Sequence, residues 1–84
     1  MKVQWTDEAV AELKAINAYL TQYSAKAAYE TVTRLILSAG RLADLPQSGH
    51  KLPEFNQTDV RELLVRPYRI IYRILPERID IITV

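Results

Sequence analysis

The 84-residue sequence contains no cysteine and a single histidine, His50. Without cysteine there is no disulfide framework and no thiolate chemistry. No group of His, Asp or Glu shows the spacing of a metal site, so we expect neither a metal nor a cofactor. A glycine-rich phosphate-binding loop, a nucleophile elbow and an internal repeat are also missing. These absences exclude the enzyme classes that can be identified from such short motifs. We therefore assign no catalytic residue from a motif.

Long apolar runs and a strong charge imbalance are missing as well. No apolar segment approaches the ~20 residues that a membrane span needs, and the first ten residues lack the apolar core of a secretory signal. The net charge is only +1, whereas a nucleic-acid-binding domain is expected to be strongly basic. We therefore expect one cytoplasmic domain covering residues 1–84, without membrane contact and without direct sequence-specific binding to nucleic acid.

The last part of the chain, residues 60–84, predicts three consecutive antiparallel strands. Runs rich in Ile, Val, Leu and Tyr suit a pleated, half-buried surface. Pro67 and Pro76 separate these runs, because proline cannot donate a hydrogen bond within a central strand. The predicted strands are Val60–Val65, Tyr68–Leu75 and Arg78–Val84.

The middle strand has two faces of different character, because side chains alternate along a strand. The apolar face consists of Tyr68, Ile70, Tyr72 and Ile74. The opposite face consists of Arg69, Ile71, Arg73 and Leu75. Arginines on a central strand stand on a rigid platform, and arginine suits bidentate recognition of phosphate or carboxylate. The alternative is that these arginines are solvated or form ion pairs with Glu62 and Asp80.

The first half of the chain predicts a short strand and two helices. Residues 2–5 alternate between polar and apolar. Thr6 and Ser24 are good N-caps, and apolar residues recur at helical spacing after each of them. The first helix is expected to reach about Tyr23, and the second to end before Pro46. Residues 49–59 show no periodicity and are predicted to be a surface connection.

These elements predict a two-layer α+β domain with the element order β-α-α-β-β-β, in which the helical hairpin packs on one face of an antiparallel sheet. The hairpin is expected to return the chain to the end where the first strand finishes. The first strand could then join either edge of the sheet and keep it antiparallel.

The last strand supplies apolar side chains to both faces of this sheet. Ile79 and Ile81 are expected to face the helices, whereas Ile82 and Val84 would lie on the open face together with Ile71. Apolar patches beside charged residues often mark a partner site. We therefore predict that Ile71, Ile82 and Val84 bind a partner protein. The alternative is that the first strand or a loop covers them.

Several blocks of the sequence resemble the RelE/ParE superfamily of bacterial toxins. The strongest match is VRELLV at residues 60–65 followed by PYRIIYRI at residues 67–74, which is similar to the family's VRELLV…YRIIYRV block. WTDEA at residues 5–9 is similar to the start of the family's first helix. Leu45-Pro46, with Gly49 and Leu52-Pro53-Glu54, resembles the loop before its second strand. The resemblance covers nearly the whole chain and implies the RelE/ParE fold.

Within this superfamily the sequence looks more like the ParE branch, whose members poison DNA gyrase, than the RelE branch, whose members cut messenger RNA on the ribosome. The resemblance implies a non-enzymatic toxin of the plasmid-stabilisation type that binds gyrase and is neutralised by a cognate ParD-like antitoxin. We assign target binding to Arg61, Arg69 and Arg73 from their placement on the sheet. The partner residues Ile71, Ile82 and Val84 then become the antitoxin-binding residues.

The alternative is a RelE-like, ribosome-dependent endoribonuclease. Cutting RNA requires activation of the 2′-hydroxyl, stabilisation of a charged phosphorus centre and protonation of the leaving oxygen. Arg69 matches the family position of a phosphate-stabilising arginine, with Arg61 and His50 as further candidates. The Tyr, His or Lys/Arg group of the family's C-terminal tail has no counterpart, because the sequence stops at Val84, and arginine is a poor general base. RNA cleavage is therefore disfavoured. A third possibility is that the protein is a relative of these toxins without toxic activity.

Overall fold

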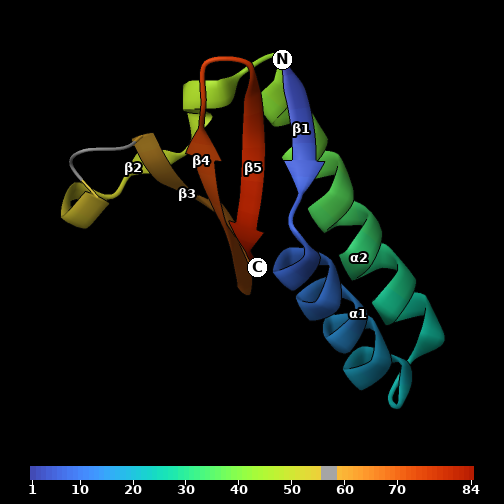
Figure 1. Cartoon of the computed structure of the whole chain (residues 1–84). Coiled ribbons are helices and arrows are strands. Elements are labelled where there is room, and N and C mark those ends of the chain that lie inside the picture. The colour runs from blue at the N-terminus through green and yellow to red at the C-terminus, as the bar shows by residue number, and fades with distance from the viewer. Residues whose placement is uncertain (56–58) are drawn as a thin grey trace.

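The computed structural model describes residues 1–55 and 59–84 and shows two helices beside a five-stranded sheet in this part of the chain (Figure 1). The helices are α1 (Asp7–Thr21) and α2 (Ala25–Gly40), and the strands are β1 (Lys2–Trp5), β2 (His50–Lys51), β3 (Asp59–Val65), β4 (Tyr68–Ile74) and β5 (Arg78–Thr83). Three short 3-10 turns, η1 (Arg41–Ala43), η2 (Pro46–Ser48) and η3 (Pro53–Phe55), lie between α2 and β3. The predicted two-layer α+β class is confirmed. Among the described helices, none is long and apolar enough to cross a membrane.

Both predicted helix caps are present. The hydroxyl of Thr6 accepts a hydrogen bond from the backbone N–H of Ala9 at 3.2 Å, and that of Ser24 accepts one from Ala27 at 3.0 Å. These bonds satisfy backbone donors that the first turn of a helix leaves free. The Thr6 hydroxyl also donates to the carbonyl of Ile81 at 2.7 Å. The start of α1 is therefore fastened to the last strand of the sheet.

The sheet order is β1-β5-β4-β3-β2, with the predicted antiparallel meander of β3, β4 and β5 at its centre. The expectation of an entirely antiparallel sheet is wrong, because β1 pairs with β5 in parallel. Helix α1 continues in the direction of β1, so α2 returns past the start of that strand (Figure 1). The amino group of Met1 donates to the carbonyl of Ala43 in η1 at 3.1 Å. The helical hairpin thus returns the chain to the end where β1 begins, not to the end where it finishes.

A second correction concerns the predicted surface connection at residues 49–59, of which residues 56–58 lie outside the described residues. The connection contains the short strand β2, whose His50 is paired with Glu62 and whose Lys51 is paired with Arg61. Two residues are too few to show a period in the sequence. Strand β2 forms the edge of the sheet beside β3.

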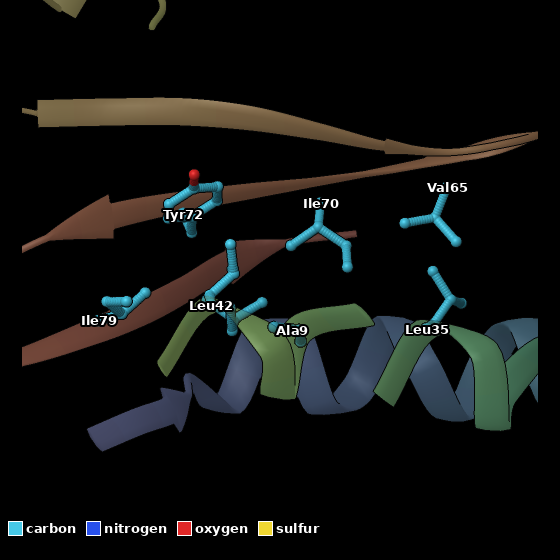
Figure 2. Close-up of a cluster of buried hydrophobic side chains, with 9 residues drawn as sticks. Ala9, Leu35, Leu42, Val65, Ile70, Tyr72 and Ile79 are labelled. Carbon is cyan, nitrogen blue, oxygen red and sulfur yellow. The ribbon is translucent and has the colours of Figure 1, made fainter. Parts of the chain in front are cut away.

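The core lies between the helices and one face of the sheet (Figure 2). The predicted inner face of β4 is confirmed, because Ile70 and Tyr72 are fully buried and Tyr68 and Ile74 pack against the same cluster. The buried members of the cluster are Ala9, Leu35, Ala39, Leu42, Val65, Ile70, Tyr72, Ile79 and Ile81. The helices therefore cover the face that the alternation in β4 and β5 predicted.

The end of β5 departs from strict alternation. Tyr72 pairs with Ile81 but Ile71 pairs with Thr83, so Ile82 is an extra residue in β5. Such a bulge changes which side of the sheet the following residues face. Val84 consequently packs against the core cluster, and its backbone N–H donates to the Glu12 carboxylate at 3.0 Å. Val84 also lines a small pocket with Arg69 and Ile71, so it lies at the boundary between the core and the open face and not fully on the open face as expected.

Candidate functional site

The face of the sheet that the helices leave open carries a groove of about 420 Å³. Side chains of β3, β4 and β5 line it, together with two residues that follow β2. The lining residues are Leu52, Glu54, Val60, Arg69, Ile71, Arg73, Ile82 and Thr83. Of the six residues that the sequence singled out for binding, the groove brings together Arg69, Arg73, Ile71 and Ile82.

Arg69 projects from β4 toward the solvent and contacts a carboxylate on the neighbouring strand. Its Nη1 lies 2.7 Å from Oε2 of Glu62, and its side chain is 65% exposed. The alternative reading, an ion pair with Glu62, is therefore confirmed for Arg69. An exposed pair of this kind contributes at most about 1 kcal/mol, because water and salt screen it. The guanidinium remains accessible to another molecule.

Arg73 has different surroundings. It lies directly opposite Asp80 in the pairing of β4 with β5, but the Asp80 carboxylate accepts hydrogen bonds from Arg78 at 2.8 and 3.4 Å. The bond to Asp80 raises the pKa of the Arg78 guanidinium. Within residues 1–55 and 59–84, the Nε of Arg73 is buried and has no acceptor. The expected ion pair with Asp80 is thus made by Arg78 and not by Arg73.

Arg61 is not part of the groove. Its partner in the pairing of β3 with β4 is Tyr72, so its side chain leaves the sheet on the side of the helices. It donates from Nε to Asp59 Oδ1 at 2.9 Å and from Nη1 to the carbonyl of Gly49 at 3.1 Å, and it is only 15% exposed. The structure therefore separates Arg61 from Arg69 and Arg73 and uses it to hold the segment before β2.

A polar junction that the sequence analysis did not identify lies behind this segment. The Tyr72 hydroxyl donates to the carbonyl of Pro46 at 2.7 Å and accepts from the backbone N–H of Gly49 at 2.9 Å. Burial raises the pKa of Tyr72. A Cβ on residue 49 would lie 2.7 Å from the Tyr72 hydroxyl and 2.8 Å from the Glu62 carbonyl, so only glycine fits. The sequence contained one signal for this junction, a tyrosine on the predicted inner face of β4. A buried tyrosine hydroxyl needs a hydrogen-bond partner.

The aliphatic residues of the open face are less exposed than the sequence suggested. Ile71 and Ile82 are half-buried in the lining of the groove. Most of the exposed large apolar side chains within the described residues lie elsewhere, namely Met1, Tyr19, Tyr23, Tyr29, Ile36, Leu37 and Leu45. Leu64, the partner of Arg69 on β3, is the exception on the open face. The open face therefore offers a groove with apolar lining and not a flat apolar patch.

His50 lies beside the groove. Because it pairs with Glu62, its side chain emerges on the open face, close to the carboxylate that holds Arg69. His50 is exposed. Among the described residues, no group of three or more His, Asp or Glu could hold a metal ion.

Comparison with known proteins places this chain and its fold in a family. The family model described as "ParE toxin of type II toxin-antitoxin system, parDE" matches residues 3–84. The protein named "Toxin RelE2" from Caulobacter vibrioides is 34% identical over 84 residues, which cover 99% of this chain and 91% of that protein. A solved structure titled "Chromosomal ParDE TA system from P. aeruginosa" has a TM-score of 0.79 at 27% identity and covers 99% of this chain and 91% of its own. The chain therefore belongs to the ParE toxin family of type II toxin–antitoxin systems, as its resemblance to the RelE/ParE superfamily indicated.

Proposed function

We propose that this toxin acts by binding DNA gyrase and inhibiting it, without catalysing a reaction itself, and that a cognate ParD-like antitoxin neutralises it. The observation that carries the proposal is the composition of the groove. Four aliphatic side chains, Leu52, Val60, Ile71 and Ile82, lie beside two guanidinium groups. Arginine over an apolar surface is typical of protein–protein interfaces, where it is enriched at the residues that contribute most to binding.

Neither the two arginines of the groove nor the nearby Tyr72 hydroxyl is suited to transfer a proton. Arginine remains protonated at neutral pH, so Arg69 and Arg73 cannot serve as general bases. The Tyr72 hydroxyl is occupied by Pro46 and Gly49, and its pKa is raised by burial. Binding is therefore the activity that this arrangement supports best.

The same groove holds residues assigned to the target and residues assigned to the antitoxin. Ile71 lies between Arg69 and Arg73 on the same face of β4, and Ile82 lies on the neighbouring strand β5, so all four side chains line the groove together. An antitoxin segment that covers the two isoleucines also covers the two arginines. Neutralisation then follows from occupation of the surface that gyrase requires, and an amphipathic helix or an added strand would suit the groove.

Purified gyrase tests the proposal. We expect DNA supercoiling to fall when the full chain is added, and Arg69→Ala to weaken this inhibition about tenfold, because a charged contact is lost at the rim of the interface. Arg66→Ala is the matched control, since Arg66 is exposed in the turn between β3 and β4. Supercoiling that continues unchanged, with no stabilised DNA cleavage, would reject gyrase as the target.

The antitoxin surface is tested by a charge placed in the groove. Ile82→Asp is expected to weaken the complex with the antitoxin at least about tenfold, because the interface would bury an unpaired carboxylate. Calorimetric titration measures the affinity, and circular dichroism verifies that the variant is folded. Ile36→Asp provides the control, because Ile36 is 46% exposed on α2. Equal losses of antitoxin affinity in both variants would show that the antitoxin does not bind specifically in the groove.

A second candidate function, ribosome-dependent cleavage of messenger RNA, is supported by the position of His50. His50, Glu62 and Arg69 are neighbours on the open face, and Glu54 adds a carboxylate to the groove. Such a set contains groups able to donate and accept protons beside a phosphate-binding arginine. Cleavage of a message in a translation extract that is lost in both His50→Gln and Arg69→Ala would establish this function in place of gyrase inhibition.

A further inference from the structure

We infer that Arg73 binds one carboxylate of the antitoxin, and that the antitoxin segment in the groove is aliphatic on both sides of this acidic residue. The inference rests on the proposed binding of the antitoxin in the groove. It adds the chemistry of recognition, namely a single Asp or Glu side chain directed at a single guanidinium.

In the part of the chain that the structure describes, the Arg73 side chain has a polar atom without a partner. Its Nε is buried, and no acceptor for it exists among the described residues. Buried donors without a partner are rare in folded proteins, because they lose their hydrogen bonds to water without replacement. The nearest candidate across the strand pair is Asp80, which is already bound to Arg78 through both carboxylate oxygens. An acceptor for Arg73 is therefore expected to come from another molecule.

The other arginines that line or surround the sheet do not share this feature. Arg61 donates to Asp59 and to two backbone carbonyls, and Arg69 is bound to Glu62. Arg34 donates to the carbonyl of Arg66 at 2.8 Å. Among the residues that the structure describes, Arg73 is thus the arginine with a buried nitrogen and no acceptor, and it lines the groove.

The charge around the groove favours a peptide carboxylate over a chain of phosphates. On the open face, the arginines at positions 69, 73 and 78 are matched by Glu54, Glu62 and Asp80, and Lys2, the partner of Arg78 in β1, adds one positive charge at the edge. A polyanion such as RNA needs a surface of net positive charge, since each phosphate requires a counter-charge. A nearly balanced face with one unsatisfied guanidinium suits a ligand that carries one negative charge at this place.

Apolar side chains lie on both sides of Arg73. Val60 is its partner on β3, and Ile71 precedes it by two residues on the same face of β4. Ile82 and Leu52 complete the apolar part of the lining. An acidic side chain would therefore be flanked by aliphatic side chains of the same segment. Burial by these groups excludes water, which strengthens an ion pair with Arg73.

A double-mutant cycle with the antitoxin encoded by the neighbouring reading frame tests the inference. Arg73→Gln in the full chain is expected to weaken the complex about 30-fold or more, as is usual when one partner of a buried charge pair is removed. One Asp→Asn or Glu→Gln substitution in the antitoxin should cause a similar loss with the wild-type toxin. Combined with Arg73→Gln, that substitution should cause little further loss. Arg66→Gln, in the exposed turn, should bind like the wild type.

A second measurement leaves the toxin sequence unchanged. In the wild-type chain labelled with 15N-arginine, the Nε–H signal of Arg73 should shift and exchange still more slowly when the antitoxin is added, because the buried N–H gains an acceptor. Antitoxin binding without coupling between Arg73 and any carboxylate would overturn this inference but leave the proposed antitoxin site intact. A single-stranded RNA oligonucleotide that loses binding in Arg73→Gln, with antitoxin affinity unchanged, would assign Arg73 to a phosphate instead. No antitoxin binding to the wild-type chain would refute the proposed partner itself.

Discussion

Leu35→Ala is expected to lower the free energy of unfolding by about 3–5 kcal/mol, the range observed when a fully buried leucine is truncated and a cavity remains. Leu35 is completely buried where α2 faces the sheet, opposite Val65 in Figure 2. A domain of this length has a total stability of about 4–13 kcal/mol. The substitution therefore removes a large part of the stability, and the variant should be partly unfolded near body temperature.

Urea denaturation followed by circular dichroism measures this loss. Leu37→Ala is the matched control, because the same residue type stands two positions later in α2 and is 58% exposed. The control should change the free energy of unfolding by no more than about 0.5 kcal/mol. Similar losses in the two variants would show that the side of α2 that packs on the sheet has been assigned incorrectly.

Tyr72→Phe is expected to lower the free energy of unfolding by about 2–4 kcal/mol, although the ring itself is retained. The hydroxyl is the partner of the Gly49 N–H and of the Pro46 carbonyl, and both would be left without it. The Gly49 N–H is buried and the Pro46 carbonyl is partly buried, and a buried polar group that loses its partner costs about 1–3 kcal/mol. Tyr29→Phe, at a position that is 72% exposed, serves as the control and should be near neutral. A neutral Tyr72→Phe would mean that water replaces the hydroxyl.

The same residue makes stability depend on pH in the alkaline range. Burial raises the pKa of Tyr72 above its ordinary value near 10, so the unfolded chain releases this proton at a lower pH than the folded chain does. The stabilisation that the neutral Tyr72 hydroxyl gives to the folded state is complete below about pH 10 and decreases as the pH rises further. The phenolate also cannot donate to Pro46. Urea midpoints measured between pH 8 and pH 11 should fall less steeply in Tyr72→Phe than in the wild type, and identical slopes would exclude this linkage.

Local patterns were sufficient for the predictions that depend on burial along one element. The alternation in β4 identified Ile70 and Tyr72 as core residues, and the caps Thr6 and Ser24 marked the helix starts. Such patterns are reliable because a strand or a helix repeats its buried side with a fixed period. The same alternation also predicted that Arg69 and Arg73 share one face with Ile71, which the groove confirms.

The sequence did not predict those parts of the candidate site that depend on contacts between different strands and loops. Arg61 was grouped with the other two arginines, but the pairing of β3 with β4 directs it to the segment before β2. The sequence likewise contained no sign that Arg78 would take Asp80 and leave Arg73 without an acceptor. Both outcomes depend on which charged groups the sheet brings within reach of each other, and sequence spacing does not specify this.

The sequence by itself determined the two-layer class, the inner face of the sheet and the family, because these follow from periodic burial and from local motifs. Only the tertiary structure decided that β1 runs parallel to β5, that residues 50–51 add an edge strand, and that the bulge at Ile82 turns Val84 toward the core. These features arise from backbone hydrogen bonds between distant segments and from the direction in which α1 leaves β1. Backbone groups are the same in every residue type except proline, so such pairings leave little trace in the amino-acid sequence.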